Sequence, residues 1–150
     1  MNEFHVLSRL LIAAAAGALI GIEREYRGHP AGLRTHLLVC VGSALIMITN
    51  IYLCGEYVSG TDVTRMAAQI VSGIGFIGAG TIIRSGANIR GLTTAATLWI
   101  SAAIGIAAGA GFVSALIYAT VIVAVGLTLL RPVSNFLSKN NKHYHQDPSD

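Results

Sequence analysis

An apolar run from Met66 to Ile83 contains no charged residue and has four glycines within eight positions. The order Gly73-x-Gly75-x-x-Gly78 has the spacing of a dinucleotide-binding loop. Such a loop lies between a strand and a helix, with an acidic residue about 20 positions further on. Here the next acidic residue is Asp147. In a bilayer, glycines instead allow two helix backbones to approach. The run therefore predicts a membrane-spanning helix and disfavours a soluble nucleotide-binding enzyme.

The rest of the chain shares this apolar character. Only 11% of its residues are charged, whereas soluble domains average about 25%. Five runs approach the ~20 apolar residues that a helix needs to cross a bilayer. They cover Phe4–Ile22, Thr35–Cys54, Met66–Ile83, Leu92–Ala108 and Phe112–Leu130. We expect an all-α, polytopic integral membrane protein with about five transmembrane helices and glycine-rich helix packing.

The first run has a second interpretation. Between Arg9 and Glu23 it offers only the short uncharged segment Leu10–Ile22. Arg9, the apolar residues and Ala14-x-Ala16 follow the order of a secretory signal peptide, whose cleavage would leave four spans. Four spans would leave the two ends of the chain on the same side of the membrane. The distribution of basic residues instead favours five spans, with the two ends on opposite sides.

With five spans, eight of the ten Lys and Arg residues lie on one side of the membrane, and Arg9 and Arg65 lie on the other. Cytoplasmic connections are enriched in Lys and Arg, so we expect an external N-terminus and a cytoplasmic C-terminus. We assign residues 1–137 to a transmembrane domain and 138–150 to a short polar cytoplasmic tail. The net charge of +3 is a topology signal, and we expect no nucleic-acid partner.

Glycines recur where helices are expected to touch. Small residues four positions apart form a groove that admits a neighbouring helix. An unwound backbone that lines a ligand is the alternative explanation. The candidate packing residues are Gly17, Gly21, Gly73, Gly75, Gly78, Gly80, Gly105 and Gly109.

A charged segment follows the first run. Glu23 and Arg27 are four residues apart and can form an ion pair on a continuing helix. A charged edge flanks three different spans but falls on the predicted cytoplasmic side, and it consists of Glu23, Arg24, Arg34 and Arg90. One hypothesis is a single surface that holds a partner or an anionic lipid headgroup. Simple anchoring of the topology is the other.

Polar residues recur within two of the runs. Gln69 shares a helical face with Arg65, and Thr93, Thr97 and Ser101 recur every fourth residue in the next run. If these stripes face each other, they form interhelical hydrogen bonds or line a polar cavity or ion path.

Motifs for catalysis, cofactors and metals are not found in the sequence. Runs two to five contain no Asp or Glu, although Mg²⁺ prefers carboxylate oxygen ligands. The chain also lacks a phosphate-binding GxxxxGK[ST] loop, an HExxH motif and a GxSxG elbow. We therefore expect no catalytic residue, no cofactor and no metal site.

Three segments carry a family resemblance. In order, they read ALIGIEREYRGHPAGLRTHLLVCVGSAL, RMAAQIVSGIGFIGAGTIIR and RGLTTAATLWISAAIGIAAGAG, and they cover about residues 17–111. They resemble the MgtC/SapB family of bacterial membrane proteins, and the apolar layout extends the likeness to about residue 131. Seven of the matching positions form what we call the candidate functional surface. They are Glu23, Arg24, Arg34, Arg65, Gln69, Arg90 and Thr94.

The resemblance implies a multi-pass protein of the bacterial inner membrane, linked to growth in low magnesium and, in some pathogens, to virulence. Many members carry a soluble C-terminal domain, which we expect this chain to lack. We expect a non-enzymatic regulatory or interaction protein whose partners are membrane lipid and a second copy or another membrane protein. The alternative is a small transporter or channel for Mg²⁺ or another cation or solute.

Overall fold

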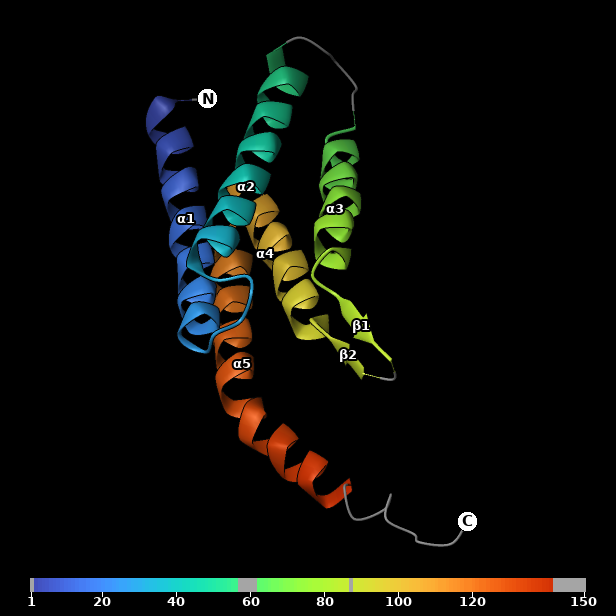
Figure 1. Ribbon diagram of the computed structural model, residues 1–150. Helices are drawn as coiled ribbons and strands as arrows, with labels where there is room; N and C mark the ends of the chain where they lie inside the picture. The colour runs from blue at the N-terminus through green and yellow to red at the C-terminus, as the bar shows by residue number, and fades with distance from the viewer. Residues whose placement is uncertain (1, 57–61, 87, 142–150) are drawn as a thin grey trace, which may run out of the picture.

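The computed structural model describes residues 2–56, 62–86 and 88–141. Within them, helices run alternately up and down, and one small antiparallel sheet joins two of the helices (Figure 1). We call the end that carries the α1–α2 connection and the sheet the hairpin end. The elements are α1 (Glu3–Tyr26), α2 (Leu33–Glu56), α3 (Thr64–Ala79), β1 (Ile83–Ser85), β2 (Asn88–Arg90), α4 (Leu92–Ala110) and α5 (Val113–Asn141).

The helices have the length and composition of membrane spans. In the described part of the chain, α1, α2, α4 and α5 are long and apolar enough to cross a membrane. The 16 residues of α3 reach only about 24 Å, less than the ~30 Å of hydrocarbon. The expected all-α, polytopic membrane fold is confirmed, with five helices of which four have the full length of a span.

The third apolar run is a helix only in part. α3 ends at Ala79, and the run continues into β1, which pairs with β2 so that Ile83 faces Arg90. Gly91 closes this hairpin with φ 91°, and a Cβ at this position would collide with the carbonyl oxygen of Thr81. The link between β2 and α4 therefore requires glycine. Hydropathy did not reveal the change from helix to strand, because the residues after Ala79, up to Ile83, carry no charge.

The last helix is longer than expected. The fifth apolar run ends at Leu130, just before Pro132, but α5 continues through Pro132 to Asn141. Proline removes one N–H donor from a helix, and a bend is a common outcome. The C-terminal part of α5 curves away from the bundle in Figure 1. The expected tail boundary at residue 138 falls inside α5, and residues 142–150 lie outside the described residues.

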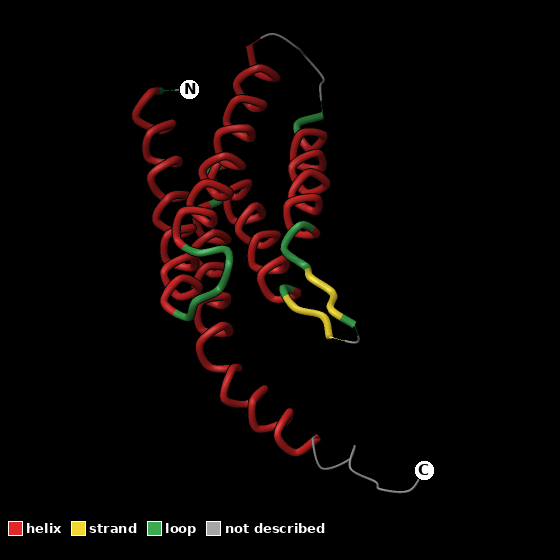
Figure 2. The backbone as a smooth tube through the Cα atoms, viewed as in Figure 1, coloured by secondary structure: helices red, strands yellow, loops and turns green. Residues whose placement is uncertain are grey.

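The core lies between α1, α2 and α4, and α5 packs against α1 and α4. α3 rests mainly on α4 and has few contacts with α2, so it stands apart from the other helices in Figure 2. Small side chains dominate the core and allow the helices to approach closely. The central buried cluster is Ala13, Ala16, Ile20, Cys40, Ala44, Ile104, Ala108 and Leu116.

Candidate functional site

A line of buried polar side chains runs between α1, α2 and α4. We call it the polar seam, and each of its members is at most 4% exposed. Buried polar groups are costly unless they are hydrogen-bonded, so the partners of each group decide what the seam can do. The members are Arg24, His36, Thr94, Thr97 and Ser101.

The hydroxyls of the seam bond within α4 and toward the other helices. Arg24 Nη2 donates to Thr94 Oγ1 at 3.1 Å. Thr97 Oγ1 donates to the carbonyl of Thr94 at 2.9 Å, and Ser101 Oγ donates to the carbonyl of Thr97 at 2.8 Å. Donation to a carbonyl on the preceding turn satisfies a hydroxyl without water. The hydroxyl protons of Thr97 and Ser101 are therefore used in hydrogen bonds within α4.

His36 has polar partners at both ring nitrogens and joins α2 to α4 through Nε2. Its Nδ1 lies 2.9 Å from the carbonyl oxygen of Gly32, and its Nε2 lies 3.2 Å from Thr97 Oγ1. A carbonyl oxygen only accepts hydrogen bonds, so Nδ1 carries a proton. Thr97 is thereby linked to α2, 61 residues away in sequence. The ring acts as a polar bridge in an otherwise apolar contact.

Arg24 places a positive charge at the hairpin end of the seam. Its guanidinium is buried between α1 and α4, with 3% of the residue exposed. A buried charge acts through a lower effective dielectric than water and is screened less by salt. The group therefore repels cations from the seam.

A second polar region is a pocket of about 470 Å³ between α1, α4 and α5. We call it the cationic pocket. Glu23 and Arg27 pair there as the sequence spacing predicted. One wall carries charged and polar side chains, and the wall formed by α5 is apolar. The lining residues are Glu23, Arg24, Arg27, His29, Thr93, Val123, Gly126, Leu127 and Leu130.

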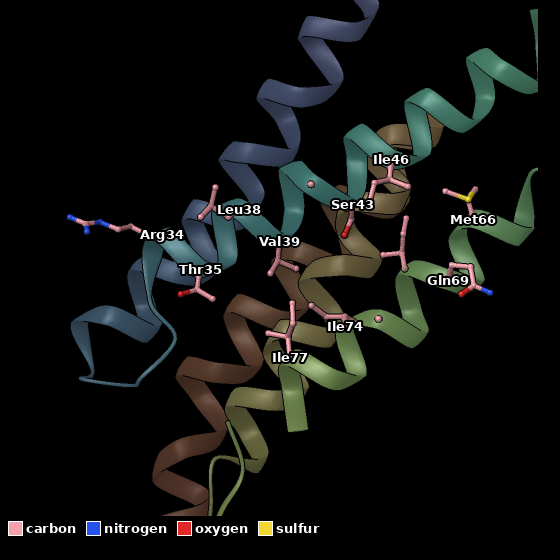
Figure 3. Close-up of a pocket in the computed structure, with 13 residues that line it drawn as sticks. Arg34, Thr35, Leu38, Val39, Ser43, Ile46, Met66, Gln69, Ile74 and Ile77 are labelled. Atoms are coloured by element: carbon pink, nitrogen blue, oxygen red, sulfur yellow. The ribbon is translucent and has the colours of Figure 1, made fainter. Parts of the chain in front are cut away.

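The larger opening, about 690 Å³, lies between α2 and α3, and we call it the α2–α3 groove. Side chains of the two helices face each other across it, with Arg34 near one end and Met66 and Gln69 near the other (Figure 3). The remaining lining is mostly aliphatic. It consists of Thr35, Leu38, Val39, Gly42, Ser43, Ile46, Ile70, Gly73, Ile74 and Ile77.

The candidate functional surface is divided between these places. Arg24 and Thr94 are hydrogen-bonded in the polar seam, and Glu23 lines the cationic pocket beside Arg24. Arg34 and Gln69 line the α2–α3 groove. These residues are therefore not brought into one continuous site.

The other two members lie at opposite ends of the fold. Arg90 is exposed on β2 at the hairpin end, and Arg65 is exposed in the first turn of α3 at the far end. Beside Arg65, Asp62 accepts hydrogen bonds from the backbone N–H of Thr64 at 2.8 Å and from its hydroxyl at 2.6 Å. These bonds lower the pKa of the Asp62 carboxyl below its usual value. Asp62 thus caps α3 as a carboxylate.

Four of the predicted packing glycines lie against backbone. A Cβ at Gly17 would come within 2.6 Å of the carbonyl oxygen of His36, and one at Gly21 within 2.6 Å of Leu33 Cα. On α4, a Cβ at Gly109 would meet the carbonyl oxygen of Ala44 at 2.5 Å. Gly105 is placed in the same way against the carbonyl of Cys40.

The glycines of α3 lie differently. Around Gly73 and Gly75, no other part of the described chain comes within 4 Å of an added Cβ, so the helix contact expected there is not made within this chain. Gly78 has an ordinary contact of 3.5 Å with Ala95 Cβ. A Cβ at Gly80 would approach the carbonyl oxygen of Ile77, in its own helix, at 3.3 Å.

The polar stripe of α4 faces a different helix from the one expected. Thr93 is exposed, and Thr94 takes the buried position instead. The stripe meets α2 through His36, not α3 through Gln69. Our sequence reasoning did not single out His36. A lone histidine in an apolar run was the available signal, because such a ring needs polar partners.

Metal ligation has no cluster of candidate side chains in the described ranges. Among those residues, no group of three or more His, Cys, Asp or Glu side chains lies close enough to hold an ion.

Comparison with known proteins identifies relatives. The sequence profile described as "MgtC family" matches residues 10–136. YhiD of Escherichia coli K12, named "Putative magnesium transporter YhiD", is 46% identical over 141 residues, covering 91% of this chain and 65% of its own. None of the solved structures matches significantly.

Two further relatives carry the name "Protein MgtC". The protein of Brucella abortus (strain 2308) is 48% identical over 133 residues, covering 89% of this chain and 54% of its own. The protein of Salmonella typhimurium is 45% identical over 139 residues, covering 93% and 58%. The chain thus spans less than two thirds of the length of these relatives.

Proposed function

The chain belongs to the MgtC family, and from that premise we propose that it is a non-enzymatic regulatory and interaction protein of the bacterial inner membrane. It supports growth or adaptation under low magnesium, including virulence where the host restricts this ion. The magnesium link is supported by the name of the Escherichia coli relative. The N-terminus lies outside, and the hairpin end with its arginines faces the cytoplasm.

The α2–α3 groove is the observation that carries this proposal. Its lining positions follow helical spacing on both α2 and α3, so two continuous helix faces line an open space. Gly42 on α2 and Gly73 on α3 lie on opposite walls, and neither has a described atom within 4 Å of an added Cβ. Glycines with open space beside them allow a foreign helix to approach the backbone. The groove fits a transmembrane helix of a partner or of a second copy.

A transporter of Mg²⁺ is the second candidate, favoured by the name of the Escherichia coli relative. The polar seam is the line of polar side chains along which an ion could cross the described part of the bundle, and the buried guanidinium of Arg24 lies at its hairpin end. A fixed positive charge raises the energy of a divalent cation at this point. A path through one chain is therefore disfavoured, and transport would need a route between subunits.

Growth in low magnesium tests the interaction function. Gly42→Leu and Gly73→Leu place a side chain in the groove, and we expect both to reduce growth support while membrane insertion is unchanged. Gly75→Leu is the matched control, because Gly75 is on α3, has equal open space and does not line the groove. Equal growth of all three variants and the wild type would refute the groove as the working surface.

Ion flux tests the alternative. Wild-type protein in liposomes should show no more Mg²⁺, Na⁺ or K⁺ flux than empty liposomes. Flux that grows with protein content, and that Gly73→Leu leaves intact, would establish transport and overturn the regulatory proposal.

A further inference from the structure

The cationic pocket joins two kinds of wall at one end of the bundle. α1 and the α1–α2 connection contribute Arg24, Arg27 and His29, and α4 contributes Thr93. α5 contributes an aliphatic wall, which includes Leu127. A pocket with one cationic and one aliphatic wall suits a molecule that has the same two parts.

The charged wall favours an anion. Two guanidinium groups, of Arg24 and Arg27, and one carboxylate, of Glu23, line the pocket. Without His29, the lining side chains therefore carry a net charge of one positive unit. Glu23 is paired with Arg27, and Arg24 is held in place by its bond to Thr94 at 3.1 Å. A guanidinium held in a fixed geometry suits a phosphate group, because its planar fork donates two parallel bonds.

The start of α4 adds to this preference. Thr93 is the second residue of α4, and no side chain caps that helix at its N-terminus. The first-turn N–H groups of a helix carry a partial positive charge that favours anions. Thr93 lines the pocket, so the first turn of α4 lies beside the arginine side chains.

The aliphatic wall selects an amphiphile over a free ion. Val123, Leu127 and Leu130 line this side, and no described atom lies within 4 Å of an added Cβ at Gly126. Free phosphate gains nothing from such a surface, whereas an acyl chain packs against it and is removed from water. A chain already in a bilayer still gains packing contacts along α5.

We infer that the cationic pocket binds an anionic phospholipid, with the phosphate at Arg27 and Arg24 and an acyl chain along α5. The pocket lies at the hairpin end, where the phosphates of a bilayer leaflet are found when α1, α4 and α5 span the membrane. This site is separate from the α2–α3 groove, so it stands or falls independently of the proposed function.

Lipid binding to the purified full chain tests the inference. Protein freed of lipid in a neutral maltoside detergent is titrated with phosphatidylglycerol, with phosphatidylcholine of the same chains, and with inorganic phosphate. Retained lipid is counted by native mass spectrometry, and the thermal midpoint is followed in parallel. We expect phosphatidylglycerol to bind, phosphatidylcholine to bind at least tenfold more weakly (~1.4 kcal/mol), and phosphate to compete only weakly.

Charge variants give effects of opposite sign. Arg27→Gln should weaken phosphatidylglycerol binding about tenfold, the effect of one lost charge-assisted bond. Glu23→Gln frees Arg27 from its ion pair and should tighten binding, a result that damage to the fold cannot produce. Arg84→Gln is the matched control, because Arg84 is an exposed arginine of the hairpin end outside the pocket.

Three outcomes overturn the inference. Equal weakening of phosphatidylglycerol binding by Arg27→Gln and by Arg84→Gln would show a non-specific effect of surface charge. Phosphatidylcholine binding as tightly as phosphatidylglycerol would remove the electrostatic basis. Inorganic phosphate giving the full thermal shift would identify a site for the free ion and refute the role of the aliphatic wall.

Discussion

Replacement of Gly17 by alanine tests how closely α1 and α2 are packed. An added Cβ would lie 2.6 Å from the carbonyl oxygen of His36 and 2.9 Å from Leu37 Cα. Ordinary contacts begin at 3.4 Å, so α1 must move by about 0.8 Å against backbone atoms that cannot rotate away. Overpacking of this kind costs about 1–3 kcal/mol, and the helix propensity of alanine returns about 1 kcal/mol.

We therefore expect Gly17→Ala to lower the free energy of unfolding by up to about 2 kcal/mol. Gly73→Ala is the matched control, because nothing in the described chain lies within 4 Å of its Cβ. It should leave stability unchanged or raise it by up to about 1 kcal/mol. Unfolding in mixed micelles can be followed by fluorescence of Trp99, the single tryptophan. Equal stability changes in the two variants would refute the close contact at Gly17.

Two further predictions use the same assay or a local probe. Thr94→Val removes a hydrogen-bond acceptor of the buried Arg24 guanidinium and should lower the free energy of unfolding by about 1.5–3 kcal/mol. Thr93→Val, at the exposed neighbouring position, should lower it little. A larger loss for Thr93→Val than for Thr94→Val would contradict the assigned bond. Because Thr64 lowers the pKa of Asp62, the Asp62 cap of α3 should be fully present at neutral pH and be lost as pH falls below about 4. Faster amide exchange in the first turn of α3 at acid pH, absent in Asp62→Ala, is the expected signature, and identical pH profiles for the two proteins would contradict it.

Predicting the helices needed only local information. An apolar run of sufficient length forms a helix in a bilayer because every backbone group must then be bonded within the segment. The pairing of Glu23 with Arg27 was equally local, since both lie on one helix at a four-residue spacing. Local information failed at Gly91, where the carbonyl of Thr81, ten residues earlier, leaves no room for a Cβ.

The site depended on which helix faces meet. Spacing alone selected Thr93, Thr97 and Ser101, but the packing of α4 against α1 and α2 buries Thr94 and exposes Thr93. The partner of Thr97 is His36, 61 residues away, and no periodic pattern within one run indicates such a contact. The sequence by itself determined the membrane helices, because hydropathy and backbone hydrogen bonding act over a few residues. The tertiary structure alone decided the polar seam, the groove and the cationic pocket, because each is formed by side chains from helices that meet only when the bundle packs.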